Sequence, residues 1–175
     1  IAHKFNTDYD ENCFILPEPL MNKSTTRIMS LRDGTNKMSK SDISEYSRIL
    51  MTDSNDQISL KIKKAKTDSL KMPDTLKGAE TRLEINNLLN IYSACGLIDK
   101  EEVISKYASR EISLFKKDLT EVIIKTVEPI SIKTNLLLKD ETYLDKVLRE
   151  GASKARVIAD KTIRNIYDKI GMISK

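Results

Sequence analysis

From residue 42 onward, apolar side chains recur at steps of three and four positions, which places them on one face of an α-helix. We therefore expect five or six helices and a mainly helical fold for this part of the chain. The segments that carry the pattern are SDISEYSRILM, SNDQISLKIKKAKTD, ETRLEINNLLNIYSACG, DKEEVISKYA, SLFKKDLTEVIIKTVEPISIKTNLLL and DETYLDKVLREGASKARVIADKTIRNIYDKIG.

Capping residues predict where several of these helices begin and end. Asp42 with Glu45, and Asp99 with Glu102, have the spacing of a capping box at a helix start. Gly96 follows an apolar run and should end that helix, because glycine adopts the left-handed conformation of the C′ position without steric cost.

Two residues should interrupt the longer runs. Pro129 lies inside the apolar run that starts at Phe115, so we expect a kink or a break there, because proline removes a backbone hydrogen bond. Gly151 should end a helix that starts behind another candidate cap, Asp140, and a further helix should follow it. The stretch 67–79 has no period and is predicted to be a linker.

The first part of the chain has a different pattern. Residues 1–6 look like the end of a helix, whereas CFILPEPL (13–20) and TRIMSL (26–31) are short apolar runs typical of strands, with the loop MNKSTT (21–26) between them. Two short strands do not form a stable sheet alone, so they should pair with strands that this sequence does not contain.

Composition excludes some classes of protein. The 175 residues are 39% hydrophobic and 32% charged, and 5 Gly and 4 Pro are too few for an all-β fold with many tight turns. The absence of Trp and an aromatic content of 5% argue against a stacking platform for single-stranded bases. A net charge of +4 does not by itself indicate nucleic-acid binding.

The stretch RIMSLRDGTNKMSKSD (27–42) carries the candidate chemistry. Lys37 and Lys40 are compact cations, and Ser39 and Ser41 are hydroxyl donors, which together suit a polyphosphate. One ammonium 4 Å from a phosphate charge gives about 4 kcal/mol at an effective dielectric of 20. Gly34 would let the loop open and close over a nucleotide. The alternative is a solvated basic turn before a helix.

The remaining reactive side chains add little. His3 is the sole histidine and is expected at the surface, while Cys13 and Cys95 form no metal-ligand pattern and fit a reduced, cytoplasmic setting. No apolar run approaches the length of a membrane span, so no membrane partner is expected. The chain opens with IAHKFN, without an initiating Met, and we interpret it as the middle of a longer protein.

KMSKS is the second signature of class I aminoacyl-tRNA synthetases, and RIMSLRDGTNKMSKSD resembles the form found in the tryptophanyl-tRNA synthetase family. Further segments resemble that family in the same order, over nearly the whole chain: FILPEPLM, NNLLNIYS, LFKKDLTEVIIKTVEPI and LREGASKARVIADKTIRNIYDKIG. Tyrosyl-tRNA synthetases share the fold, but their bacterial members usually carry an additional RNA-binding domain after the helices.

The resemblance implies a fold and two domains. The fold class would be mainly α, the truncated end of a Rossmann-type α/β nucleotide-binding fold followed by a helical anticodon-binding domain. Residues 1–42 would be the last part of the catalytic domain with the KMSKS loop. Residues 43–175 would be the anticodon-binding domain, with its last helices packing back on the catalytic domain.

The resemblance also implies an activity. Such enzymes join L-tryptophan to ATP, releasing pyrophosphate, and transfer the tryptophanyl group to tRNA(Trp). Mg²⁺ is expected with ATP, although no carboxylate here can be named as its ligand. The implied site residues are Lys37 and Lys40 for the leaving pyrophosphate, Ser39 and Ser41 for phosphate oxygens, and Met38 and Ile28 for backbone contacts to the adenine.

The sequence departs from the family pattern in one respect. The first signature, HIGH, is absent from the 175 residues, and the tryptophan pocket and ribose-binding glycines also belong to an N-terminal half that these residues do not include. We therefore expect this part to be inactive alone. The complete enzyme is expected to be a cytoplasmic homodimer.

Two basic segments are candidates for an RNA-binding face. They are KIKKAK (61–66) and the last helix, with Lys154, Arg156, Lys161 and Arg164, although such residues are usually just solvated. Asn86, Asn87 and Asn90 could read bases, but polar contacts between helices are the more ordinary role. The rival functions are an independent helical RNA-binding module without ATP chemistry and a plain helical interaction domain.

Overall fold

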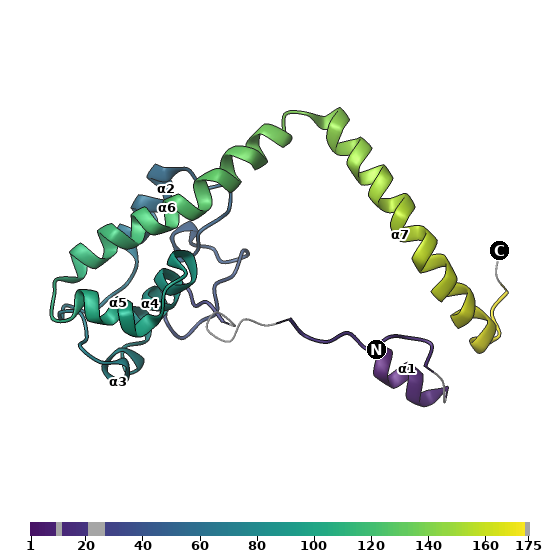
Figure 1. Cartoon of the computed structure of the whole chain (residues 1–175), viewed down its shortest axis with the longest axis horizontal. Helices are drawn as coiled ribbons and strands as arrows, with labels where there is room; N and C mark the ends of the chain where they lie inside the picture. Colours follow the sequence, from purple (N-terminus) through teal and green to yellow (C-terminus); the bar gives the residue numbers. More distant parts are fainter. Residues whose placement is uncertain (10–11, 21–26, 174–175) are drawn as a thin grey trace. The chain divides into compact units, whose positions relative to one another are not determined.

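The computed structural model describes residues 1–9, 12–20 and 27–173 of the chain. It is mostly helical and divides into two compact units, Ile1–Leu20 with Leu137–Lys175, and Met21–Leu136. The helices of the described residues are α1 (Ala2–Asp8), the short 3₁₀ helix η1 (Glu45–Ser47), α2 (Asn55–Lys64), α3 (Leu76–Glu80), α4 (Leu83–Gly96), α5 (Lys100–Tyr107), α6 (Ile112–Leu137) and α7 (Glu141–Ile170) (Figure 1).

The larger unit, Met21–Leu136, folds around one hydrophobic core to which α2 to α6 contribute. Ile58, Ile62 and Ala65 are buried as their spacing predicts. Full burial of each large apolar side chain is worth about 1.5–3 kcal/mol, so this shared core stabilises the whole unit. The core also contains Leu31, Met72, Ala79, Ile85, Leu88, Leu89, Ile91, Tyr92, Val103, Ile104, Tyr107, Ile112, Phe115, Leu119, Ile123 and Val127.

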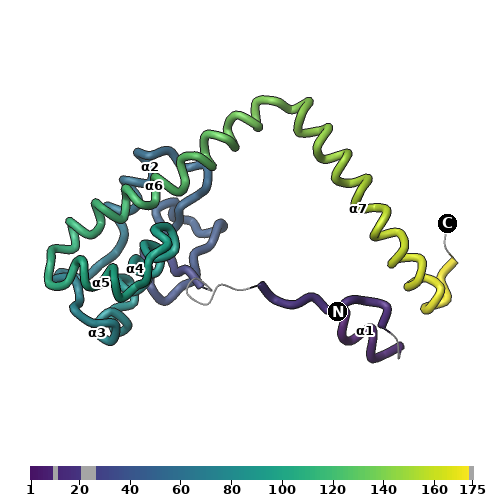
Figure 2. The backbone as a smooth tube through the Cα atoms, viewed as in Figure 1, coloured from purple at the N-terminus to yellow at the C-terminus, as the bar shows by residue number. Residues whose placement is uncertain are grey.

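Helix α6 is continuous (Figure 2) and contains Pro129, so of the kink or break expected there, the break does not occur. Val127 and Ser131, on either side of the proline, are both buried. Burial on both sides of Pro129 holds the helix there and offsets the hydrogen bond that the proline cannot donate.

Helix α7 also runs through the position where an end was predicted. Asp140 caps it as expected, since the Asp140 carboxylate accepts a hydrogen bond of 2.9 Å from the backbone N–H of Tyr143. Gly151 lies inside the helix, which ends instead at Gly171 with a left-handed φ of 72°. A single interior glycine costs about 1 kcal/mol relative to alanine, which a long helix tolerates. None of the residues of α7 is buried.

The two predicted capping boxes do not form. The Asp42 carboxylate accepts from the N–H of Ser44 at 2.8 Å, and only the short η1 follows, so the helix expected over SDISEYSRILM is absent. Asp99 precedes α5 but makes no side-chain cap. A capping box occurs instead at Ser54 and Gln57, at the start of α2.

The end of α4 also differs from the expectation. Gly96 is the last residue of the helix, and Leu97 adopts the left-handed conformation, with φ 54°. The backbone N–H of Ile98 donates to Ser93 O at 3.3 Å and the Ser93 hydroxyl donates to Ile98 O at 2.5 Å. These two bonds hold the turn that a leucine would otherwise disfavour.

Within the described residues, neither run predicted to be a strand forms one. The only pairing in 27–42 is an isolated antiparallel bridge between Met29 and Lys37, and 13–20 has none. The predicted loop 21–26 lies outside the described residues. A short apolar run becomes a strand only when another strand pairs with it, so the pattern alone could not produce one.

The N-terminal segment is held by local contacts. The Asn6 amide donates to Phe14 O at 2.8 Å and accepts from the Phe14 N–H at 3.0 Å, while the Phe5 ring packs edge-on against Phe14. α1 confirms the predicted helix near residue 1. No helix among the described residues combines the length and apolar character needed to cross a membrane.

Candidate functional site

Residues 27–42 form an irregular hairpin, here called the signature hairpin. Its two arms are joined around the Met29–Lys37 bridge by backbone hydrogen bonds from Ser30 N to Asn36 O, at 2.8 Å, and from Met38 N to Ile28 O, at 3.0 Å. The hairpin therefore brings the predicted adenine-binding position, Ile28, next to the start of the KMSKS sequence.

The turn of the hairpin is built around one carboxylate. Asp33 accepts hydrogen bonds from the Thr35 N–H at 2.9 Å, from the Thr35 hydroxyl at 2.6 Å and from the Asn36 amide at 2.7 Å. The hydrogen bonds from Thr35 are the main reason that the pKa of Asp33 lies below its usual value, because they stabilise the charged form. The turn is thus fixed by its own side chains.

Glycine is required at the next position of the turn. A Cβ built on Gly34 would lie 2.9 Å from the Cβ of Leu83 and 2.9 Å from the backbone nitrogen of Glu84. The hairpin turn therefore packs directly against the start of α4. Glu84 also forms an ion pair of 3.0 Å with Lys66, and the hydrogen bond from Lys66 is the main reason that the pKa of Glu84 is lowered.

A buried asparagine anchors the first arm of the hairpin. The N–H of Met29 donates to the Asn87 side-chain oxygen, and the Asn87 amide donates to Met29 O, each at 2.8 Å. Asn87 is 2% exposed, so it is unavailable to RNA, and its polar contact is with the hairpin rather than with another helix. Asn86 accepts a hydrogen bond from Lys100 on α5, which is the expected polar contact between helices.

The residues of the KMSKS sequence differ in exposure. Lys37, Ser39, Lys40 and Ser41 are exposed, whereas Met38 is half-buried and packs against the core. The two serine hydroxyls lie 3.0 Å apart, and the Ser41 N–H donates to the Ser39 hydroxyl at 3.3 Å. Within the described residues neither lysine forms an ion pair at 4.0 Å or less.

A cavity of about 430 Å³ lies beside the second arm. It brings together Met38 and Lys40, two of the predicted site residues, but Lys37, Ser39 and Ser41 do not line it. Ile28 does not line it either. Its remaining wall is the segment that follows η1: Arg48, Ile49, Leu50, Met51 and Thr52.

Arg48 makes contacts beside the site that the sequence did not indicate. Its guanidinium donates to Asp42 O at 2.8 Å and to Ser44 O at 3.2 Å, so it ties down the chain just after the signature. The Arg48 Nε is buried and has no partner within the described residues. Nothing in EYSRIL distinguishes this arginine from a surface residue, because its acceptors are backbone carbonyls.

No metal site is present among the described residues, which contain no group of three His, Cys, Asp or Glu side chains able to hold an ion. Mg²⁺ that enters with a nucleotide is held largely by phosphates and water, so it needs no protein cage. We assign no residue to it. Cys13 and Cys95 are free thiols, and burial raises the pKa of Cys95.

The lysines of KIKKAK do not form one exposed basic face. Lys61 is 6% exposed and its amine lies 2.5 Å from the carboxylate of Asp53, which is also buried. Lys64 lies over the Tyr46 ring at 3.9 Å, and Lys66 is paired with Glu84. Lys61 is therefore excluded as a candidate for an RNA-binding face, because it is buried and its charge is paired with Asp53.

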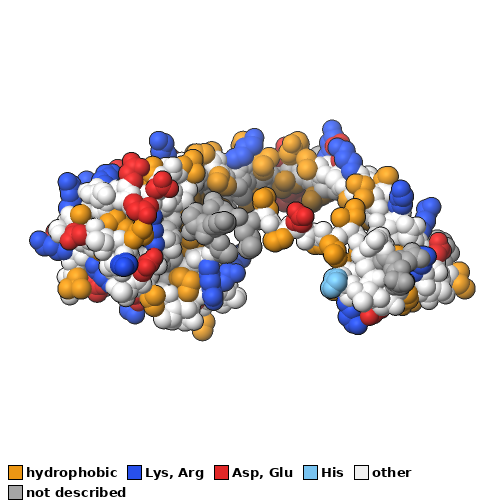
Figure 3. All heavy atoms as spheres, turned by 60° about the horizontal axis from the view of Figure 1, so that its bottom comes forward, with side chains coloured by type: hydrophobic (Ala, Val, Ile, Leu, Met, Phe, Trp, Pro, Cys, Tyr) orange, Lys and Arg blue, Asp and Glu red, His pale blue; other side chains and the backbone are white. Residues whose placement is uncertain are grey.

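The four basic residues predicted on the last helix are exposed on α7: Lys154, Arg156, Lys161 and Arg164. Asp160 lies between them in the sequence. Figure 3 shows Lys and Arg side chains interspersed with Asp and Glu side chains on the face of the molecule in view. A role of these residues in RNA binding stays a prediction.

Comparisons with known proteins identify the family of the chain. Residues 1–128 match the family model described as tRNA synthetases class I (W and Y). The tryptophan–tRNA ligases of Rickettsia felis and Caulobacter vibrioides are 46% and 42% identical over 99% and 98% of this chain, covering 52% and 50% of their own lengths. The chain thus spans about half the length of the curated relatives it matches.

Solved structures of tryptophanyl-tRNA synthetases are also similar to this chain. The tryptophanyl-tRNA synthetase from Mycoplasma pneumoniae superposes with a TM-score of 0.78 at 25% identity, over 99% of this chain and 53% of that one. The enzyme from Campylobacter jejuni, complexed with ADP and tryptophan, gives a TM-score of 0.64 at 26% identity over 98% of this chain and 51% of that one.

Proposed function

The chain belongs to the class I tRNA synthetases of the W and Y family, and on that premise we propose that it is the KMSKS-bearing part of a tryptophan–tRNA ligase. The specificity for tryptophan is supported by the relatives, since the similar curated proteins named above are tryptophan–tRNA ligases. The activity itself belongs to a protein about twice as long.

The observation that carries the proposal is the pair of exposed lysines on an anchored hairpin. Asn87 and the contact at Gly34 fix the base and the turn, while Lys37 and Lys40 form no ion pair within the described residues. Their charges are thus available to an anion. A solvated surface turn would not need a buried asparagine and a glycine packed against a helix.

In the reaction we propose, the tryptophan carboxylate oxygen attacks the α-phosphorus of ATP. The bond between the α-phosphorus and its bridging oxygen breaks, and pyrophosphate leaves with the electron pair. Lys37 and Lys40 stabilise the negative charge that develops on this leaving group, which is where preorganised cations lower a barrier. Ser39 and Ser41 donate to phosphate oxygens, and the backbone at Ile28 and Met38 contacts the adenine.

The domain assignment follows from the same premise. Residues 1–42 complete a Rossmann-type catalytic domain, whose remaining strands pair with the runs that stay unpaired here. Residues 43–175 form the helical part that contacts the anticodon of tRNA(Trp). The last helix packs back on the catalytic domain, a role supported by its exposed apolar positions, because faces of this kind are normally covered: Val147, Leu148, Val157, Ile158 and Ile163.

The complete enzyme is proposed to act as a cytoplasmic homodimer with ATP, Mg²⁺, L-tryptophan and tRNA(Trp) as its ligands. Closed two-fold dimers are the commonest oligomers. This chain alone is proposed to be inactive, since neither the HIGH signature nor a tryptophan pocket is among its 175 residues.

The test is tryptophan-dependent exchange of pyrophosphate into ATP. The chain is joined to the amino-terminal half of the Rickettsia felis relative, and Lys40→Ala is compared with Lys71→Ala, an exposed lysine outside the hairpin. Removing a group that stabilises transition-state charge lowers the rate by about 100-fold or more. Exchange that survives Lys40→Ala unchanged would remove the catalytic role and favour an RNA-binding module without ATP chemistry.

A further inference from the structure

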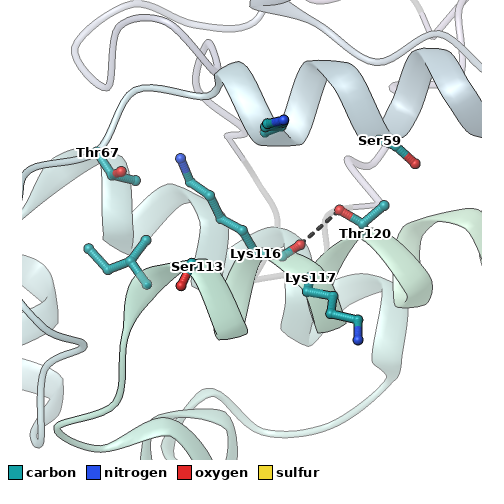
Figure 4. Close-up of a pocket in the computed structure, with 8 residues that line it drawn as sticks. Ser59, Thr67, Ser113, Lys116, Lys117 and Thr120 are labelled. Carbon is teal, nitrogen blue, oxygen red and sulfur yellow. Dashed lines mark hydrogen bonds between the residues drawn. The ribbon is translucent and has the colours of Figure 1, made fainter.

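A second cavity, of about 530 Å³, lies between α2 and the first half of α6 (Figure 4). None of the residues assigned to the signature site lines it. Its wall contains three lysines and four hydroxyl side chains and no acidic residue: Ser59, Lys63, Thr67, Ile112, Ser113, Lys116, Lys117 and Thr120.

The positive charge of this cavity is not neutralised by the protein. Lys63, Lys116 and Lys117 form no ion pair of 4.0 Å or less within the described residues. Lys116 extends toward the loop after α2, where its amine donates to Ala65 O at 2.7 Å, whereas Lys117 turns its amine to the opposite side (Figure 4). A carbonyl acceptor satisfies one donor but leaves the charge uncompensated.

The environment of Lys116 makes this charge costly. Burial is the main reason that the pKa of Lys116 lies below its usual value, and the nearby charge of Arg32 lowers this pKa further. Arg32 reaches this position because its guanidinium donates to Lys64 O, at the end of α2. An anion in the cavity would offset the repulsion between these cations.

The hydroxyls provide the matching hydrogen bonds. Ser59 donates to Asn55 O and Thr120 donates to Lys116 O, each at 2.8 Å, so their oxygens remain as acceptors. Thr67 and Ser113 form no side-chain hydrogen bond within the described residues, so both hydroxyls can donate to a ligand (Figure 4). Ammonium groups combined with free hydroxyl donors are suited to phosphate oxygens.

We propose that this cavity binds a phosphate group, at a site separate from the signature hairpin. Lys63 and Lys116 supply the charge, and Thr67 and Ser113 supply the hydrogen bonds. The phosphate comes either from the backbone of an RNA strand or from a free phosphate or pyrophosphate ion. The inference goes beyond the proposed ligase function, because it requires neither Lys37 nor Lys40.

The test follows the amide resonances of Thr67 and Ser113 in the isotope-labelled 175-residue chain by NMR. Inorganic phosphate, pyrophosphate and a short single-stranded RNA are titrated separately at constant ionic strength, with acetate as the control anion. The variants are Lys63→Gln and Lys63→Gln/Lys116→Gln. Lys133→Gln is the matched control, because Lys133 is an exposed lysine on the same helix and lies outside the cavity.

Saturable shifts at Thr67 and Ser113 are expected. The affinity should fall about 10-fold in the double variant, because two cations that contact the phosphate are lost, and should stay within about twofold in Lys133→Gln. Each lysine that contacts RNA also contributes about 0.7 to the slope of log affinity against log salt concentration. Lys63→Gln changes an exposed residue, so it tests the site even if the double variant does not fold. RNA binding without binding of the free ions identifies the backbone as the source, and binding of the free ions identifies a small-anion site.

Three results would overturn the proposal: no shift with any phosphate ligand, shifts that persist unchanged in the lysine variants, or equal shifts with acetate. The Lys40→Ala variant is expected to retain binding at this cavity. Failure here would leave the pyrophosphate exchange test untouched, so the two proposals can fail independently.

Discussion

Asn87 on α4 holds the backbone of Met29 through two hydrogen bonds of 2.8 Å, across a sequence separation of 58 residues. One amide side chain thereby satisfies both the donor and the acceptor of a strand-like residue that has no strand beside it on that edge. The pair attaches the signature hairpin to the helical core, so the position of Lys37 and Lys40 depends on a residue far from them in the sequence.

Asn87→Ala should therefore loosen the hairpin. The substitution leaves the N–H and the carbonyl of Met29 without partners, and we expect the free energy of unfolding to fall by about 2 kcal/mol. Denaturant titration of the chain measures this loss. Asn90→Ala on the same helix is the control, since the Asn90 side chain forms no hydrogen bond within the described residues, and equal losses in both variants would contradict the anchoring role.

Two Gly→Ala substitutions should have opposite effects. Alanine at position 34 places a Cβ 2.9 Å from Leu83 and Glu84, so Gly34→Ala should displace the hairpin and destabilise the chain by about 1–3 kcal/mol. Nothing lies within 4 Å of a Cβ at Gly151, inside α7, so Gly151→Ala should stabilise that helix by about 0.5–1 kcal/mol. Thermal unfolding followed by circular dichroism checks the two signs.

The buried pair Lys61–Asp53 should behave as a structural element. Lys61→Met leaves the Asp53 carboxylate buried and unpaired, which costs about 3–5 kcal/mol of unfolding free energy. Lys63→Met, two residues further along α2 and exposed, should change stability by less than about 0.5 kcal/mol. Similar losses in the two variants would show that Lys61 is not distinguished by its partner.

The ion pair between Glu84 and Lys66 predicts a dependence on pH. The pKa of Glu84 is lowered from 4.5, mainly by the hydrogen bond from Lys66. Because the folded-state pKa lies below the unfolded one, the stability from Glu84 is present above pH 4.5 and is lost as pH falls through the folded pKa.

Lys66→Gln should bring the pKa of Glu84 back toward its ordinary value, so the part of the stability that is lost in acid should become smaller. The titration of the Glu84 carboxyl carbon by NMR measures this pKa directly. Lys77→Gln, an exposed lysine on α3, is the control, and a Glu84 pKa that does not move in Lys66→Gln would exclude the pair as its cause.

Several elements could be predicted from the pattern of residues alone. The stripe of Ile58, Ile62 and Ala65 is buried as its period indicates, and Asp140 caps α7. The pentapeptide KMSKS and the segments around it indicated the family that the comparisons show. These features depend on neighbours within a few positions, which is the range over which a sequence pattern fixes the backbone.

Other features could not be predicted, because their physical cause lies in distant residues. Pro129 and Gly151 both lie inside continuous helices. Asp42 and Glu45 have the spacing of a capping box, yet the Asp42 carboxylate accepts a hydrogen bond from the Ser44 N–H instead. Local propensity costs about 1 kcal/mol for a glycine inside a helix and about 3 kcal/mol for a proline there, and tertiary packing or the length of the helix overrides both.

The sequence by itself determined where most helices lie, most of the buried apolar positions of α2, α4 and α6, and which two lysines and two serines form the signature. Only the tertiary structure decided that Asn87 anchors the hairpin rather than reading a base, and that Lys61 is buried while Lys63 borders a basic cavity. The physical reason is that helical period depends on neighbouring residues, whereas hydrogen-bond partners and charge neutralisation depend on segments that meet only when the chain folds.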